Sequence, residues 1–365
     1  MVRLFRSIHL VKSAQPECTG ICRIIMGLAK YAEPNGYECR VLFFADGPLK
    51  AQMSAAGISA HAIPWNGTFQ DVVGAVRVCL WLRRKGADLA HLHWGGRAVR
   101  AICRLGGAPA VVQHVHGRIN EITGEIPGSI SFPWADAVIA SSNAVAACVK
   151  SHRAEVIYAG IEVNPAPESL TEHSGPLQVG VLSRLTPIKN IGAVIKAAAR
   201  LREKGIEIQV NIAGSGPSEP ELRHIAAELR VTDRVCFLGW QQDIRKLLSN
   251  WDLLLMPSLD ESFPISALEA MAAARPVLAS RVGGLPEIVV GGVTGELIPP
   301  EETAALVDHI ATLANDRARL AEMGQAGWRR AQAEFSLQAT ATHMFRFYDR
   351  LLKDRLARSG DAEFI

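Results

Sequence analysis

The stretch Pro257–Pro276 reads PSLDESFPISALEAMAAARP, and it restricts the fold and the chemistry of this chain more than any other segment. It follows an apolar strand candidate at 252–256 and changes from a polar loop into a short helix. Ser262 is placed to cap that helix, and Pro264 to occupy its first position. The helix is expected to end near Arg275, because the proline after it cannot continue a helix.

Two carboxylates, Glu261 and Glu269, lie on this stretch. Eight residues of helix span about 12 Å, which is too far for the two groups to share a proton. They are better placed to hold two parts of one extended ligand, with the free N–H groups of the first helical turn as an anion site between them. Hydroxyl groups at both ends and an anion in the middle describe a nucleotide-diphosphate sugar. In the alternative interpretation, Glu261 is a loop charge that favours the helix dipole and Glu269 is a solvated helix residue.

The whole string combines Pro-Ser, then Glu-Ser-Phe-Pro, then a glutamate within Ala-Leu-Glu-Ala-Met-Ala. It resembles the signature of the retaining glycosyltransferases of family 4. The resemblance implies an α/β protein of the GT-B fold, with two Rossmann-like, doubly wound parallel-sheet domains facing a central cleft. It also implies that Ser262, Phe263, Pro264 and Glu269 bind the donor and that Glu261 is catalytic.

Length and composition agree with a soluble, two-domain protein. The chain has 365 residues, 48% of them hydrophobic, and a net charge of +3, which is too small to argue for nucleic acid as a partner. Its seven cysteines form no Cys-x-x-Cys pair, which favours a reducing compartment and a cytoplasmic location. Arg3, Arg6 and His9 interrupt the apolar N-terminus, which predicts a first strand rather than a signal peptide. No apolar run is long enough to predict a membrane span.

Strand and helix patterns alternate through both halves, which predicts parallel sheets covered by helices. The expected strands lie at 2–10, 39–44, 58–63, 88–93, 110–116, 137–140, 154–158, 177–182, 206–212, 235–240, 252–256 and 277–280. A segment rich in Pro, Ser and Glu interrupts the alternation and predicts a linker. The expected organisation is an acceptor-binding domain at 1–164, a linker at 165–176, a donor-binding domain at 177–335 and a final helix at 336–365. The resemblance implies that this last helix crosses back to the first domain.

The first loop, at 13–20, precedes a helix expected from Ile21, and such a loop can present backbone N–H groups to phosphate. It is not Gly-x-Gly-x-x-Gly, and no such motif follows any strand, which argues against a dehydrogenase. Family members usually carry a glycine pair here, and Gly20 matches one of the two. Gly20 is therefore a candidate donor-binding residue, with a simple turn residue as the alternative.

Two His-x-His pairs, His91/His93 and His114/His116, end the strands at 88–93 and 110–116. Residues two apart on a strand share a face, so a metal site is formally possible. No cysteine or carboxylate falls at ligand spacing around them, and no metal is expected. By resemblance, His116 lies against the donor sugar and His93 is a candidate on the acceptor side. His91 and His114 are expected to be buried, hydrogen-bonded histidines.

Arg184 and Lys189 follow the first strand of the second half. A planar guanidinium and a mobile ammonium together suit a diphosphate, although two surface charges on a loop are the plain alternative. The string resembles the Arg…Lys phosphate clamp of the family. A second turn, with Gly214 and Gly216, lies near the nucleotide in family members.

The expected reaction is transfer of a sugar from a nucleotide-diphosphate donor to an acceptor hydroxyl with retention of configuration. Arg184 and Lys189 would neutralise the leaving phosphate, Glu261 would hold sugar hydroxyls, Glu269 would accept from the ribose, and His116 would contact the sugar near its reacting carbon. No second carboxylate stands at nucleophile distance, so the leaving phosphate is expected to take the acceptor proton. No metal and no cofactor are expected. A catalytically silent donor-binding scaffold and a GT-B nucleotide-sugar epimerase are the alternatives.

The resemblance implies that the acceptor is a saccharide or a lipid-linked saccharide in envelope polysaccharide, lipopolysaccharide or exopolysaccharide synthesis at the inner face of the cytoplasmic membrane. The loop at 117–133 would help to select it. Arg83, Arg84 and Lys85 end a helix expected at 71–85. They either complement the helix dipole or contact anionic lipid as a peripheral membrane site.

Overall fold

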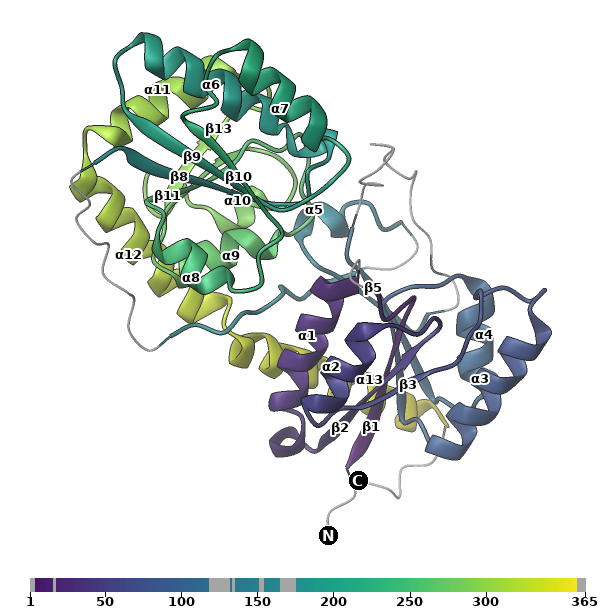
Figure 1. Cartoon of the computed structure of the whole chain (residues 1–365). Helices are drawn as coiled ribbons and strands as arrows, with labels where there is room; N and C mark the ends of the chain where they lie inside the picture. The colour runs from purple at the N-terminus through teal and green to yellow at the C-terminus, as the bar shows by residue number, and fades with distance from the viewer. Residues whose placement is uncertain are drawn as a thin grey trace. The chain divides into compact units, whose positions relative to one another are not determined.

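The computed structural model describes residues 4–15, 18–117, 132, 135–150, 154–164 and 175–359. The chain divides into two compact units (Figure 1). Of the described residues, those up to 160 and those from 337 onward belong to unit 1, and those at 161–336 belong to unit 2. The linker expected at 165–176 lies outside the described residues apart from Gly175 and Pro176. Most of the loop expected at 117–133 lies outside them as well.

The described part of unit 1 contains a seven-stranded parallel sheet of order β3-β2-β1-β4-β5-β6-β7. Its strands are β1 (Phe5–Val11), β2 (Tyr37–Phe43), β3 (Ser59–Ala62), β4 (Leu89–Leu92), β5 (Ala110–Val115), β6 (Ala137–Ala140) and β7 (Glu155–Val156). The order reverses between β1 and β4, as in doubly wound folds. Ligands of such folds bind beyond the carboxyl ends of the strands at this reversal.

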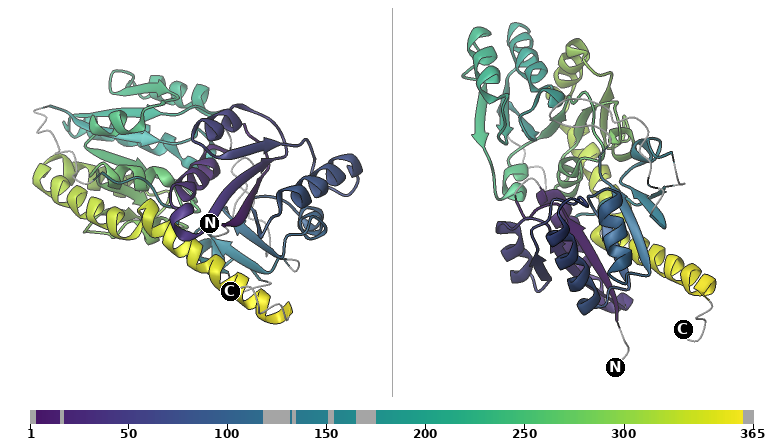
Figure 2. Two further views of the ribbon diagram at one scale, coloured as in Figure 1. Left: turned by 90° about the horizontal axis from the view of Figure 1, so that it is seen from below. Right: turned by 90° about the vertical axis from the view of Figure 1, so that its right-hand side faces the viewer.

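Helices cover both faces of the unit 1 sheet (Figures 1 and 2). They are α1 (Thr19–Lys30), η2 (Glu33–Asn35), α2 (Pro48–Ala55), α3 (Val72–Lys85), α4 (Arg97–Leu105), α5 (Asn143–Ala146) and α13 (Leu337–Ser359). The helix α13, yellow in both figures, packs against α1 and β5.

Alternate residues of the central strands enter different cores. Ile8 and Leu10 of β1 pack with Ala90 and Leu92 of β4 in the core beneath α3 and α4. Because side chains alternate along a strand, the residues between them face the opposite side of the sheet, where α1 and α13 lie. His9 is one of these residues. This alternation decides where the histidines of the unit gather.

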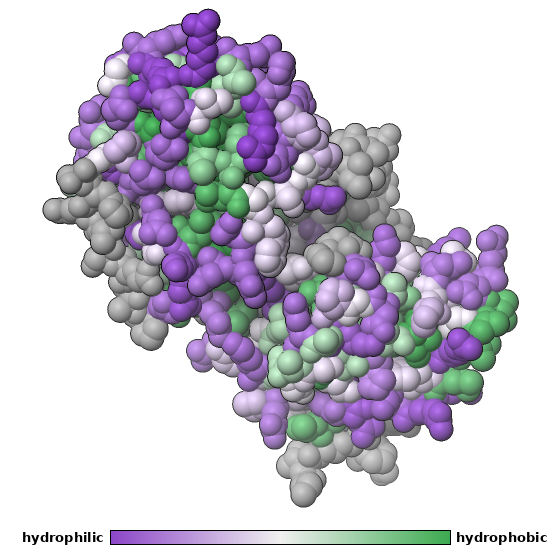
Figure 3. All heavy atoms as spheres, in the orientation of Figure 1, coloured by the Kyte–Doolittle hydropathy of each residue, from purple (hydrophilic) through white to green (hydrophobic). Residues whose placement is uncertain are grey.

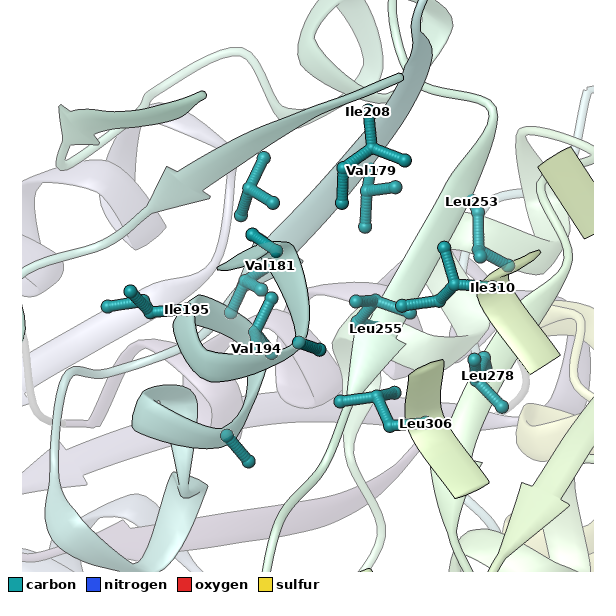
Figure 4. Packing of buried hydrophobic residues seen from close by; sticks show 14 of the residues in the cluster. Val179, Val181, Val194, Ile195, Ile208, Leu253, Leu255, Leu278, Leu306 and Ile310 are labelled. Carbon is teal, nitrogen blue, oxygen red and sulfur yellow. The ribbon is translucent and has the colours of Figure 1, made fainter. Parts of the chain in front are cut away.

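The described part of unit 2 contains a six-stranded parallel sheet of order β10-β9-β8-β11-β12-β13. Its strands are β8 (Leu177–Leu182), β9 (Ile208–Ala213), β10 (Val235–Gly239), β11 (Leu253–Met256), β12 (Val277–Ser280) and β13 (Gly295–Ile298). Its helices are η3 (Pro187–Lys189), α6 (Ile191–Glu203), α7 (Glu219–Glu228), α8 (Ile244–Ser249), α9 (Ile265–Ala272), α10 (Leu285–Ile288), α11 (Thr303–Ala314) and α12 (Arg317–Glu334). Figure 4 shows aliphatic side chains of β8, β11, α6 and α11 packed together in its core.

The expected fold class is confirmed, since both units are doubly wound parallel sheets with helices. Three local predictions are wrong. Pro264 is the N-cap of α9 with ψ 119°, so the helix begins one residue later than predicted, and Pro264 rather than Ser262 occupies the cap position. Gly20 lies inside the first turn of α1, not in the loop before it.

The strand β13 was not predicted, because its four residues include Gly295 and a glutamate and show no apolar run. Within the described residues, no helix combines the length and the apolar character that crossing a membrane requires.

Candidate functional site

A buried ion pair joins two loops of unit 2. Nζ of Lys189 lies 3.0 Å and 3.1 Å from the two carboxylate oxygens of Glu261, and Oγ of Ser258 donates to one of them at 2.7 Å. Both charged side chains are at most 10% exposed. The structure therefore places two of the predicted catalytic residues in direct contact, with each charge compensated by the other.

Strand order explains this pairing of residues 72 positions apart in the sequence. β8 and β11 are parallel neighbours, so the segments that follow them emerge at the same edge of the sheet. Leu259 N donates to Ile188 O at 2.8 Å, and Asn190 Nδ2 donates to Pro257 O at 3.2 Å. Asn190 has φ 49°, a left-handed conformation that asparagine tolerates better than most residues.

A third segment, the turn after β12, supports the backbone of Glu261. Gly284 N donates to Glu261 O at 2.9 Å. Gly283 has φ 51°, and a Cβ there would lie only 1.7 Å from Glu261 O. Glycine is required at position 283 for both reasons. Sequence reasoning assigned no site residue to this turn, although the consecutive glycines before a Leu-Pro helix start were a visible signal.

The predicted donor glycines hold two loops together. A Cβ on Gly214 would lie 1.9 Å from Ser183 O, and one on Gly216 would lie 2.2 Å from Leu185 O. Leu185 N also donates to Ser215 O at 3.0 Å. These glycines therefore allow the turn after β9 to pack on the loop that carries Arg184. A contact of either glycine with a nucleotide stays a prediction.

The remaining predicted residues of unit 2 differ in their surroundings. Arg184 is exposed, and Glu269 is half-buried on α9. Phe263 is buried and packs edge to face on Phe335, with ring centroids 5.9 Å apart. Phe263 thus anchors the signature loop to the core, a role that sequence reasoning did not separate from donor binding.

In unit 1 five histidines gather at the carboxyl ends of three neighbouring strands. His9 of β1 lies opposite His91 of β4 in the sheet register. His93 follows β4, His114 lies in β5, and His116 lies just beyond β5. All five face the side of the sheet that α1 and α13 cover. Sequence reasoning found the two pairs but missed His9, because only the register of β1 against β4 brings it beside them.

Hydrogen bonds link the histidines into two chains. The first chain joins His9 Nδ1 to His93 Nε2 at 2.9 Å and His93 Nδ1 to His116 Nε2 at 2.8 Å. The second joins the Tyr348 hydroxyl of α13 to His91 Nδ1 at 2.5 Å and His91 Nε2 to His114 Nδ1 at 3.1 Å. We call these the His9 chain and the Tyr348 chain.

Desolvation holds all five imidazoles in the neutral form, although His116 is half-buried and the other four are buried. Desolvation lowers the pKa of His9 to about 3 and that of His116 to about 4. The pKa values of His91, His93 and His114 lie well below the usual value, because burial and the charge of neighbouring histidines act together. At neutral pH none of these rings carries a charge.

A cavity of about 420 Å³ opens beside the histidines, and the described residues that line it all belong to unit 1. Its wall includes His93, His114 and His116, with Trp94 and Phe132 as aromatic surface. Two sets of three histidines, His9/His91/His93 and His93/His114/His116, place nitrogens within 4.8 Å of one another. Three imidazoles are a donor set that zinc and related ions accept.

Two sequence-family models match consecutive parts of the chain. Glycosyltransferase Family 4 matches residues 19–164, and Glycosyl transferases group 1 matches residues 164–330. Curated relatives include a D-inositol 3-phosphate glycosyltransferase from Nocardia farcinica, 38% identical over 183 residues, and an N-acetyl-alpha-D-glucosaminyl L-malate synthase from Bacillus anthracis, 30% identical over 173 residues. These alignments cover 48% and 47% of the chain and only 40% and 45% of the relatives. The chain thus matches less than half the length of either protein.

Solved structures resemble the whole chain. Anabaena HepE, determined with UDP and glucose, superposes with a TM-score of 0.79 at 22% identity over 95% of this chain and all of that one. The lipopolysaccharide outer core galactosyltransferase WaaB superposes with a TM-score of 0.71 at 16% identity over 97% of this chain. At such identities the likeness establishes the fold. Because the two family models together span residues 19–330, the chain belongs to glycosyltransferase family 4 and has the GT-B fold.

Proposed function

We propose that this protein transfers a sugar from a nucleotide-diphosphate donor to an acceptor hydroxyl with retention of configuration. The observation that carries the proposal is the buried Lys189–Glu261 pair, whose carboxylate lies on the family signature loop. Exposed Arg184 lies on the same loop as Lys189. This arrangement offers one guanidinium to an incoming anion and holds one ammonium in a fixed position.

The ion pair has a physical purpose in such a site. A lone buried ammonium would be costly, and a carboxylate that accepts two hydrogen bonds from it offsets that cost. When a diphosphate binds, Lys189 shares its three N–H donors between the phosphate and Glu261. Glu261 then holds the sugar hydroxyls, and Glu269 accepts from the ribose. Arg184 and Lys189 stabilise the negative charge that develops on the leaving phosphate.

The leaving phosphate itself takes the proton of the acceptor hydroxyl. This avoids a covalent glycosyl-enzyme, which would need a second carboxylate at the reacting carbon. The reaction needs no metal in this scheme, because the fixed cations carry the charge. An inverted product or loss of activity in chelator contradicts the respective part of the proposal.

The compared proteins indicate which substrates to test first. The HepE structures contain UDP, glucose and UDP-glucose, so we propose a UDP-sugar as the first donor to test. The proposed acceptor is a saccharide or lipid-linked saccharide of envelope polysaccharide synthesis, by analogy with the lipopolysaccharide outer core that WaaB is named for. The proposed location is the cytoplasmic face of the membrane.

We further propose that α3 contacts an anionic membrane. Its outer face exposes Val72, Val73, Val76 and Leu80 by 50–62%, and exposed Arg83 follows on the same face. Figure 3 shows apolar surface on the side of unit 1 where Figure 1 places α3 and α4. An apolar helix face that ends in cations matches the chemistry of an acidic lipid surface.

A thermal-shift screen of UDP, GDP, ADP and their sugars tests donor binding. A ligand that binds the folded protein raises its Tm by mass action. We expect one nucleotide to raise the Tm of the wild type and to lose this effect in Glu269→Ala. If none of these ligands raises the Tm, the proposed donor site is contradicted. A shift without donor consumption in the presence of acceptors supports the scaffold alternative.

A further inference from the structure

His116 ends the His9 chain, and this position limits what its ring can do. Each neutral imidazole has one N–H and one lone pair. Because every link in the chain needs one of each, the hydrogen on one ring dictates the hydrogens on the other two. The His9 chain therefore has two neutral forms, which differ only in direction. Since His93 occupies Nε2 of His116, Nδ1 is the ring nitrogen that remains for a ligand.

The ring planes show that protons rather than a metal ion join this chain. The planes of His93 and His116 differ by 14° with centroids 5.1 Å apart, and those of His9 and His93 differ by 23° with centroids 5.2 Å apart. Rings in this arrangement, with nitrogens 2.8 and 2.9 Å apart, lie edge to edge and direct their nitrogens at each other. A metal ligand directs its lone pair at the ion instead.

The direction of the chain follows from its buried end. His9 is fully buried, and its Nε2 has no hydrogen-bond partner among the described residues. In one direction this nitrogen is a bare lone pair, and in the other it is an N–H with no acceptor. Buried N–H groups without a partner are rarer in proteins than acceptors without one. His9 therefore carries its hydrogen on Nδ1 and donates to His93, which in turn donates to Nε2 of His116.

We propose that His9 and His93 are positioning residues that hold His116 as the neutral tautomer with hydrogen on Nδ1. In this form His116 presents a hydrogen-bond donor to a sugar oxygen and does not act as a general base. No proton enters or leaves the ring, which agrees with a leaving phosphate that takes the acceptor proton. The identity of the ligand rests on the proposed function, whereas the tautomer does not.

The Tyr348 chain prevents the rings from turning. His91 stacks on His93 with planes 6° apart, and His114 stacks on His116 with centroids 3.9 Å apart. His91 and His114 are themselves fixed by their hydrogen bonds to each other and to Tyr348. Rotation of His116 would break a hydrogen bond and disturb this stack, so one tautomer is maintained.

Nitrogen-15 NMR of ring-labelled histidine reads the tautomer without any substrate. The ring nitrogen signals that are present in the wild type at pH 7.5 and absent in His116→Gln are assigned to His116. We expect hydrogen on Nδ1 in the wild type and in His93→Asn, because the amide nitrogen of Asn stands in place of Nδ1 and still donates. His93→Leu removes the donor and should shift His116 toward the other tautomer. His343→Gln, on the exposed face of α13, is the matched control and should leave the spectrum of His116 unchanged.

Hydrogen on Nε2 of wild-type His116, or an unchanged tautomer in His93→Leu, overturns the proposal. Stoichiometric metal in the purified protein that shifts these ring signals and leaves with chelator overturns it too.

The second readout is donor consumption. In His93→Leu we expect the rate of donor consumption to fall roughly tenfold, which corresponds to the loss of one hydrogen bond. The affinity for the nucleotide diphosphate alone should stay unchanged. His93→Asn should recover the rate of donor consumption. A changed tautomer with unchanged consumption overturns the positioning role. Failure of the wild type to bind any nucleotide sugar defeats the proposed function, while the wild-type spectrum still decides the tautomer.

Discussion

Acidification should unfold unit 1 selectively, because its five clustered histidines are neutral when folded. A histidine whose folded pKa is depressed binds a proton more readily in the unfolded chain, so the folded state loses stability as pH falls below about 6.5. The loss continues until the folded pKa is reached, which is about 4 for His116. Above about pH 6.5 the folded state therefore keeps the stability that it loses at lower pH through protonation of the unfolded histidines.

The size of the effect follows from linkage. Between pH 7.5 and 5.5, one histidine that titrates at about 6.5 unfolded and stays neutral folded removes about 1.4 kcal/mol. Five such residues remove about 7 kcal/mol if their contributions add. A domain is typically stable by only about 5–15 kcal/mol, so unit 1 should lie near its unfolding transition at pH 5.5.

Native-state hydrogen exchange with mass spectrometry resolves the two units. We expect peptides from β1, β4 and β5 to lose protection between pH 7.5 and 5.5, after correction for intrinsic exchange, while β8 and β9 change little. His9→Phe should reduce the loss by about 1.4 kcal/mol, the contribution of one proton. His343→Gln, an exposed residue in the same unit, should not change it.

An equal loss of protection in both units would refute the reasoning, because the described histidines of unit 2, His224 and His309, are exposed or half-buried. A loss in unit 1 below about 1.4 kcal/mol would also refute it, since it would mean that the cluster accepts protons without unfolding.

Three further perturbations test other parts of the structure. Glu261→Ala should destabilise unit 2 by about 3–5 kcal/mol in urea denaturation, because it removes the carboxylate that compensates the buried Lys189 ammonium, and Lys189→Met in the same chain should recover part of that loss; strict additivity would contradict the coupling. Gly283→Ala should lower the Tm and weaken nucleotide binding, because the side chain meets the backbone of Glu261 at a positive φ; an unchanged Tm counts against a rigid turn. Leu80→Asp should reduce sedimentation with anionic liposomes and not with neutral ones, and unchanged sedimentation would exclude α3 as the contact.

The alternation of strand and helix patterns in the sequence determined the fold class. Short apolar runs bounded by turns predicted β6, β8 and β12 with their observed bounds, and the pattern from Ile191 predicted α6. These elements are decided by local periodicity and by residues next to one another. The signature at 257–276 predicted the family for the same reason, since its residue types are specific and contiguous.

Boundaries and caps were less predictable. Pro264 has an extended ψ of 119° and occupies the N-cap of α9, the position just before the first helical residue. A proline is compatible with this position as well as with the first helical position. β13 has no apolar run of its own and exists because its backbone pairs with β12. In both places several local conformations suit the residues, and the surrounding chain selects one.

Contacts between distant residues were decided only by the tertiary structure. Glu261 and Lys189 meet because β8 and β11 are parallel neighbours, and His9 joins His91 because β1 and β4 are. A sequence shows which residues alternate along a strand but not which strand lies beside it. Strand order and register follow from packing two helical layers onto one sheet, and that packing depends on the whole chain at once.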